Sequence, residues 1–175
     1  AQEAGAITSW STELSSACED ADLVILTVPS LTVQSVLETI KPTLPAQAVI
    51  TDAASVKSAI VHAAKAVFGE TPARFIPGHP IAGSEHSGFS ASTADLFRGK
   101  KVILTPLEQS DPEAVELVSS LWEALGAEVL TMTVERHDEV LAATSHLPHL
   151  LAFSLVDTLS QQGESEEIFR YAAGG

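Results

Sequence analysis

The sequence predicts an α/β fold with a mostly parallel sheet, followed by the start of an all-helical domain. Over residues 1–133, short apolar runs rich in β-branched residues alternate with amphipathic helices, a pattern typical of a parallel sheet between helical layers. From residue 134 to about 162 no strand pattern remains, and apolar residues recur at helical spacing. We therefore expect two domains, residues 1–133 and residues 134–175.

The order of elements in the first domain follows from apolar patterning and helix-end signals. Strands are expected at residues 22–29, 48–52, 74–79, 101–106 and 127–132. Helices are expected at residues 31–44, at 58–68 and between Asp111 and Gly126. Asp111 is the expected N-cap of the last helix, with Pro112 in its first turn and Gly126 after its end.

The second domain begins with one long apolar helix that contains a proline. Pro148 lacks a backbone N–H and would clash with the carbonyl of Thr144, so a kink is expected close to it. The helix is too apolar to stand alone, and we expect it to pack on further helices that this chain does not contain. Because the pattern starts and stops abruptly, we interpret the chain as part of a longer protein.

Composition excludes several classes of partner. Nine Lys and Arg residues against 23 Asp and Glu residues give a net charge of −14, so nucleic acid and anionic membrane surfaces are poor partners. No apolar run approaches the roughly 20 residues of a membrane span. The single cysteine, Cys18, cannot form an internal disulfide, which favours a reducing, cytoplasmic location.

Three clusters of polar residues follow predicted strands, at residues 27–30, 51–57 and 78–85. Ligands of open α/β sheets bind beyond the carboxyl ends of the strands, so these clusters are expected to converge on one site. His79 is the main candidate, because imidazole can accept or donate a proton near neutral pH. The alternative is a histidine that only ties a loop together by hydrogen bonds.

The other candidates each have a plainer alternative. Ser55 could serve only as a helix N-cap, and Ser84 and Glu85 could be solvated loop residues. Ser145 and His149 are spaced i and i+4 and so share a helix face, where a packing role is the alternative. A metal site is not expected there, because the spacing lacks the glutamate of zinc-binding helices and any cysteine ligand.

Several motifs occur together in order. They are GHPIAGSEHSG at residues 78–88, LFRGKKVILTP at 96–106, SHLPHLLAFSLVDTL at 145–159 and DAASVK at 52–57. In these motifs and their spacing the chain resembles the prephenate and arogenate dehydrogenases of tyrosine biosynthesis over nearly its whole length. The resemblance implies a Rossmann-type nucleotide-binding domain, with its first strand and glycine-rich turn before Ala1, joined to an α-helical dimerisation domain.

The resemblance also implies a reaction. Family members oxidise prephenate to 4-hydroxyphenylpyruvate by hydride transfer to NAD or NADP with loss of CO2, and arogenate gives tyrosine in the same way. His79 matches the histidine that accepts the hydroxyl proton, and Ser55 matches the serine beside it and the nicotinamide. The turn Val28-Pro29 matches a stretch along the cofactor.

The residues expected to bind substrate are likewise implied by the resemblance, and they are Ser84, Glu85, Ser145, His149 and Gly175. Gly175 directly precedes the stretch that holds the family's substrate-binding arginine, which we expect outside this chain. The expected protein is a cytoplasmic homodimer.

Two rival interpretations remain. A hydroxyacid dehydrogenase of the 3-hydroxyisobutyrate type uses a lysine at the start of its interdomain helix, whereas no lysine follows Lys101 here. A non-catalytic regulatory or metal-binding α/β module is the rival from another class.

Overall fold

The computed structural model describes residues 1–83, 88–162 and 169–170. The chain divides into two compact units, Ala1–His137 and Asp138–Gly175.

The strands of the first unit form two three-stranded sheets. In the first, β1 (Leu23–Leu26), β2 (Val49–Asp52) and β3 (Phe75–Ile76) run parallel in that order. In the second, β5 (Lys101–Leu104) lies between β4 (Gly78–Pro80), which is antiparallel to it, and β6 (Glu128–Thr131), which is parallel. Parallel pairing predominates, as the sequence predicts.

The strand expected at residues 74–79 is divided at Pro77. Proline has no N–H to donate to a sheet, so the ladder with β2 ends before it. The Pro77 carbonyl instead accepts a hydrogen bond from the Thr105 amide, at 2.9 Å, and the chain continues as β4 alongside β5. One extended segment therefore joins the two sheets and carries His79 at their junction.

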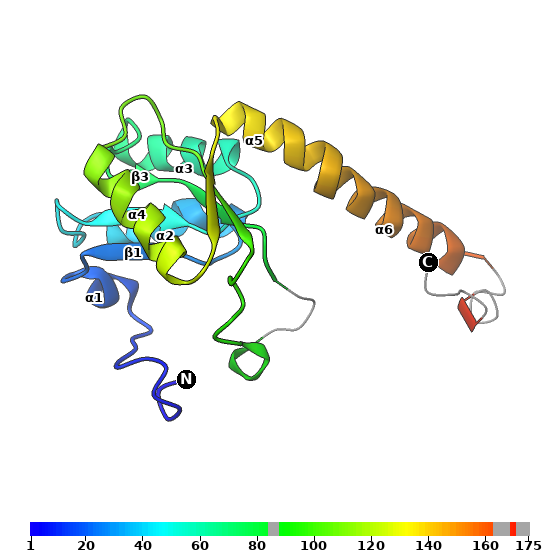
Figure 1. Cartoon of the computed structure of the whole chain (residues 1–175), viewed down its shortest axis with the longest axis horizontal. Helices are drawn as coiled ribbons and strands as arrows, with labels where there is room; N and C mark the ends of the chain where they lie inside the picture. Colours follow the sequence, from blue (N-terminus) through cyan, green and yellow to red (C-terminus); the bar gives the residue numbers. More distant parts are fainter. Residues whose placement is uncertain (84–87, 163–168, 171–175) are drawn as a thin grey trace. The chain divides into compact units, whose positions relative to one another are not determined.

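Helices cover both faces of the strands (Figure 1). Ile50 and Phe75 belong to the core that contains α2 (Val33–Ile40) and α3 (Ser58–Phe68), whereas their strand neighbours Val49 and Ile76 belong to the core beneath α4 (Pro112–Ala124). All four residues of β2 are buried, as expected for a strand with both faces covered.

Most element ends agree with the sequence analysis. The helix expected at residues 58–68 is α3, and the Asp111 carboxylate caps α4 by accepting from the Glu113 amide at 2.9 Å. The helix expected at residues 31–44 is shorter at both ends, because Ser30–Thr32 forms a 3₁₀ turn (η1) before α2 and α2 ends at Ile40. Three short elements complete the unit: α1 (Leu14–Cys18), the 3₁₀ turn η2 (Phe89–Ala91) and the first residues of α5.

The long C-terminal helix has an irregular turn just before its proline. It consists of α5 (Val134–Leu141), a π-helical turn η3 (Ala142–His146) and α6 (Leu147–Ser160), with Pro148 in the first turn of α6. A π-helical turn widens the backbone, which accommodates a proline that cannot donate to the preceding turn. The kink expected close to Pro148 stays a prediction, and the π-helical turn is the irregularity that the structure has at this place.

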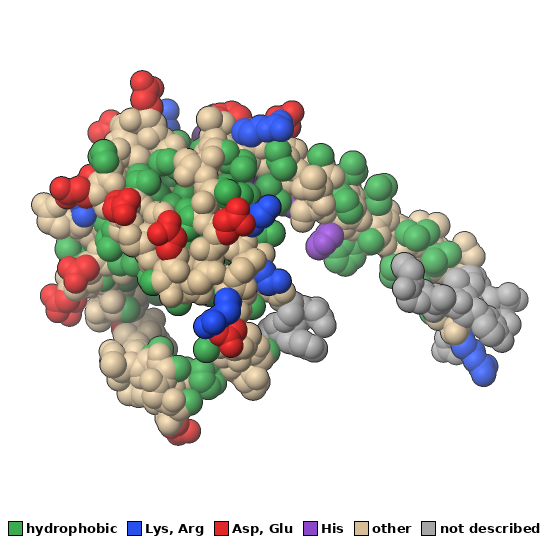
Figure 2. Space-filling model, in the orientation of Figure 1, with side chains coloured by type: hydrophobic (Ala, Val, Ile, Leu, Met, Phe, Trp, Pro, Cys, Tyr) green, Lys and Arg blue, Asp and Glu red, His purple; other side chains and the backbone are tan. Residues whose placement is uncertain are grey.

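The same helix presents large apolar side chains to solvent in the described structure. On α6 these are Leu147, Leu150, Leu151, Phe153, Leu155 and Val156. Figure 2 shows hydrophobic side chains along this helix, whereas acidic side chains are scattered over the first unit. By length and composition alone the 27-residue helix could cross a membrane, which the sequence analysis did not anticipate. Core helices of soluble proteins share these properties, so they assign no membrane location.

Candidate active site

A cavity of about 540 Å³ lies beyond the carboxyl ends of β1 and β2, beside β4. Four residues selected in the sequence analysis line it: Val28 and Pro29 in the turn after β1, Ser55 in the turn after β2, and His79 on β4. Leu96 and Phe97 form another part of the lining, and the Phe97 ring packs edge-on against Trp122. The structure thus brings together four predicted site residues from three separate segments.

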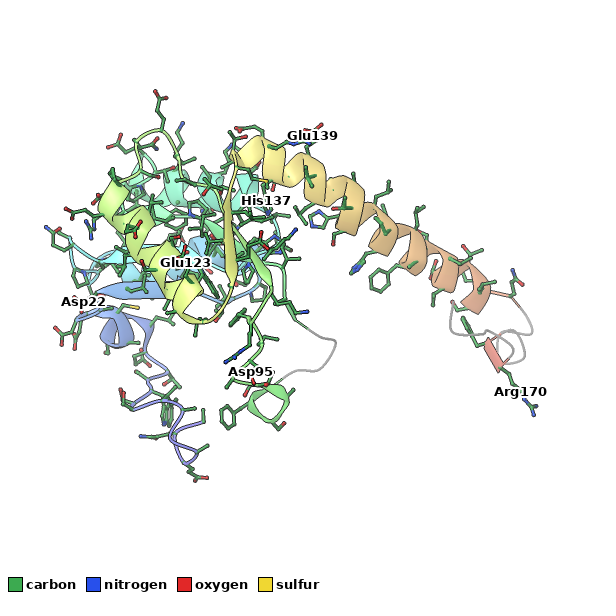
Figure 3. All side chains as sticks on the ribbon, in the orientation of Figure 1. Asp22, Asp95, Glu123, His137, Glu139 and Arg170 are labelled. Atoms are coloured by element: carbon green, nitrogen blue, oxygen red, sulfur yellow. The ribbon has the colours of Figure 1, made fainter. Side chains whose placement is uncertain are left out.

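His79 is half-buried and is held by a second histidine. Its Nδ1 lies 2.9 Å from Nε2 of His137, a residue of α5 whose side chain is 0% exposed, and Figure 3 labels His137 near the start of that helix. The bond fixes the orientation of the His79 ring and uses Nδ1. In a neutral imidazole one nitrogen donates and the other accepts, so the direction of this bond decides which nitrogen of His79 can take up a proton.

Ser55 is exposed in the turn between β2 and α3. The alternative role as a helix N-cap is wrong, because α3 begins at Ser58 and its N-cap position is occupied by Lys57. The Ser55 hydroxyl therefore belongs to the cavity lining and does not cap the helix.

A buried ion pair lies directly behind this lining. Asp52, the last residue of β2, pairs with Lys57, and both side chains are 0% exposed. The carboxylate also accepts from the amides of Ala54 at 2.9 Å and Gly78 at 3.1 Å. Burial raises the pKa of Asp52 above its ordinary value, and the Lys57 ammonium opposes that rise.

The remaining predicted residues are not brought into the cavity by the described structure. Ser84, Glu85 and Gly175 lie outside the described residues. Ser145, in the π-helical turn, and His149, on α6, belong to the second unit, so their approach to His79 stays a prediction. Within that unit, exposed His149 lies beside an apolar depression lined by Ala152, Phe153 and Val156.

A second cavity of the first unit offers less chemistry. It has a volume of about 480 Å³ and lies at the amino ends of β2 and β3. Its two cations are engaged elsewhere: Lys41 donates to the Val67 carbonyl at 2.7 Å, and Arg74 binds Asp111 at 2.5 Å. Its lining contains neither a histidine nor a carboxylate. The cavity at His79 is therefore the candidate active site.

Sequence analysis missed His137 and gave no role to Asp52 and Lys57. His137 shares a buried helix face with Val134 and Leu141, at a spacing of i, i+3 and i+7. A histidine on an otherwise apolar helix face can be recognised in the sequence, but its contact with His79 on a distant strand cannot. Asp52 and Lys57 are only five residues apart, but their hydrogen bonds to Gly78 depend on the fold, because Gly78 lies on a separate strand.

Comparison with known proteins gives the same assignment for both parts of the chain. Residues 1–131 match the family model of the prephenate dehydrogenase nucleotide-binding domain, and residues 133–175 match the model of the prephenate dehydrogenase dimerization domain. The chain belongs to the prephenate dehydrogenase family. The Rossmann-type fold and the helical segment expected from the motifs are thereby confirmed.

Similar proteins within the family include enzymes named for different substrates. A cyclohexadienyl dehydrogenase from Zymomonas mobilis is 36% identical over 93% of this chain and 55% of its own length. Prephenate dehydrogenase from Aquifex aeolicus, in a crystal structure with hydroxyphenyl propionate and NAD+, matches with a TM-score of 0.89 and 39% identity over 99% of this chain and 60% of its own. Arogenate dehydrogenase from Synechocystis matches with a TM-score of 0.74 and 30% identity over 94% and 59%.

This family member spans about half the length of the curated relatives it matches.

Proposed function

We propose that the protein containing this chain is a prephenate dehydrogenase, which oxidises prephenate to 4-hydroxyphenylpyruvate and CO2 with NAD or NADP as hydride acceptor. The observation that carries the proposal is the single cavity lined by Val28, Pro29, Ser55 and His79. These residues come from three turns or strands, and each matches a family position beside the cofactor or the reacting hydroxyl. A similar enzyme bound to NAD+ and a hydroxyphenyl compound supports the assignment.

His79 would act as the base for the reacting hydroxyl. With Nδ1 hydrogen-bonded to His137, Nε2 is the nitrogen we assign to the substrate. If Nδ1 donates its proton to His137, Nε2 carries the lone pair. Nε2 can then accept the hydroxyl proton while hydride leaves the ring carbon that bears this hydroxyl. Loss of CO2 then moves an electron pair through the ring to the oxygen, which takes the proton back. Ser55 would hydrogen-bond the hydroxyl or the imidazole and carry no proton away.

In this proposal the nicotinamide ring would lie against the turn after β2. Ala53 and Ala54 line the cavity there together with Ser55, and their small side chains would let a flat ring approach closely. Bound NAD or NADP would supply the hydride acceptor. The chain's own contribution is to hold that ring and the substrate in line, with Val28 and Pro29 along the cofactor.

The substrate's carboxylates require cations from elsewhere. The described lining of the cavity contains no Lys or Arg. We assign the contacts with these carboxylates to Ser84, Glu85, Ser145 and His149 and to an arginine of the full-length protein outside this chain. Arogenate, which differs from prephenate by an amino group in place of the side-chain keto group, is the alternative substrate.

A cytoplasmic homodimer is part of the proposal. The segment that matches the dimerization domain contains α6, whose apolar side chains are exposed in the single chain. A second copy, together with further helices of the same domain, would cover them.

The test is a substrate and cofactor matrix with the full-length protein. Prephenate, arogenate and 3-hydroxyisobutyrate are each offered with NAD and with NADP, and formation of reduced cofactor and of product is followed. Turnover of prephenate, with none of 3-hydroxyisobutyrate, is expected. Turnover of arogenate alone would move the proposal to its alternative, and turnover of neither would refute it.

A further inference from the structure

The backbone amide and carbonyl of Gly78, the residue before His79, are both hydrogen-bonded to one buried ion pair. The amide of Gly78 donates to Oδ1 of Asp52 at 3.1 Å, and the carbonyl of Gly78 accepts from Nζ of Lys57 at 2.6 Å. Both polar groups of this residue are thus bound by the two partners of the Asp52–Lys57 ion pair, and both side chains are fully buried. The backbone from which His79 extends therefore has little freedom to shift.

The same carboxylate holds the residue before Ser55. The amide of Ala54 donates to Oδ2 of Asp52 at 2.9 Å, and Lys57 binds the same oxygen. Asp52 is therefore connected to the residues that precede both chemical side chains of the cavity. These side chains belong to different segments, one in the turn after β2 and the other on β4.

The two segments approach more closely here than a side chain would permit. A Cβ at Gly78 would lie 3.0 Å from the carbonyl oxygen of Asp52 and 3.2 Å from Cδ2 of Leu104. Glycine lets β4 lie directly against the end of β2, where Asp52 and Lys57 can reach its backbone.

A buried ion pair is not needed to stabilise such a core. Removing two charges from water costs so much that an apolar pair of similar volume is often as stable or more stable. The Asp52–Lys57 pair is better explained by its hydrogen bonds, which fix one geometry at the junction of β2 and β4.

We propose that Asp52 and Lys57 are positioning residues that set the distance and orientation between Ser55 and His79 through the backbones of Ala54 and Gly78. The proposal rests on the proposed function, because it assigns the pair a role in hydride transfer. Neither residue touches the substrate, and each acts through the residue next to a cavity side chain.

The test replaces the pair with neutral side chains of similar size, in the double variant Asp52→Asn/Lys57→Met of the full-length protein. The matched control is Arg74→Met/Asp111→Asn, which removes another ion pair of the same unit, outside the cavity lining, and retains an N-cap side chain on α4. Measurements are kcat, KM for substrate, cofactor affinity, the free energy of unfolding and hydrogen exchange at the amides of Gly78 and Ala54.

We expect kcat of the double variant to fall about 100-fold, the effect of a displacement of about 1 Å, with a smaller change in cofactor affinity. Exchange at the two amides should accelerate in the folded protein, and the control should keep wild-type kcat. Wild-type kcat in a folded double variant would overturn the proposal. If the double variant does not fold, exchange in the wild type decides: protection up to global unfolding supports the proposal, and fast local exchange overturns it.

Failure of the proposed function gives a different result. The wild type would then turn over neither substrate, whereas hydrogen exchange at Gly78 and Ala54 would still report whether the pair holds the two segments.

Discussion

Replacing His137 with phenylalanine should slow the reaction without removing any atom that touches the substrate. The hydrogen bond of 2.9 Å between Nδ1 of His79 and Nε2 of His137 is lost, while the phenyl ring occupies the buried space of the imidazole. Leaving a buried polar group without its partner costs about 1–3 kcal/mol. If that cost falls on the active orientation of His79, kcat should fall by about 5- to 150-fold.

The assay is steady-state kinetics of the full-length His137→Phe variant beside its cofactor affinity and free energy of unfolding. Cofactor affinity should stay near the wild-type value, and His137→Gln, which restores a polar atom, should recover part of the rate. His62→Phe, on the exposed side of α3, is the control and should behave as wild type. Unchanged kcat in folded His137→Phe, or a loss explained by cofactor affinity alone, would refute the reasoning.

Four further outcomes follow from the same contacts. Ser55→Ala should lower kcat less than loss of His79 does, because Ser55 orients groups and carries no proton; equal losses in kinetic assays would contradict its role. Gly78→Ala should destabilise the fold by about 1–3 kcal/mol in denaturant titrations, since its Cβ would lie 3.0 Å from the Asp52 carbonyl. Asp111→Ala removes the cap of α4 and should cost about 0.5–2 kcal/mol of stability with kcat unchanged. Burial raises the pKa of Asp52 above 3.8, so the folded protein binds this proton more tightly than the unfolded chain. The free energy of unfolding of the wild type, relative to that of Asp52→Asn/Lys57→Met, should therefore decrease as the pH rises from 3.8 through the raised pKa. An increase over this pH range in unfolding titrations would show that the Lys57 ammonium has the larger effect on the pKa.

Local signals carried most of the fold prediction. Two elements were predicted from neighbouring residues alone. They are β2, from its apolar run, and α4, from Asp111, Pro112 and Gly126 at its ends, and both lie at the predicted positions. The division at Pro77 was not predicted: a proline is a local sign that a ladder ends, but the partner strand of each half of the segment is not set by neighbouring residues.

The site was predictable to the extent that topology brings strand ends together. His79 and Ser55 could be selected because parallel strands share a carboxyl edge, and the cavity there contains both. The alternative role of Ser55 as a helix N-cap is wrong because α3 begins only at Ser58. The contact between His79 and His137 could not be predicted, since it joins segments far apart in the chain. The Asp52–Lys57 pair is local, but its hydrogen bonds to Gly78 join separate segments and so depend on the fold.

The most direct test of the account compares wild-type and His79→Asn full-length protein in prephenate oxidation across a range of pH. Asparagine can still hydrogen-bond at this position but cannot act as the base. The account predicts a loss of turnover of about 100- to 10,000-fold with the fold and cofactor affinity retained, and a wild-type rate that falls at low pH as the base becomes protonated. Near wild-type turnover of His79→Asn, or a loss caused only by failed cofactor binding, would show that His79 is structural.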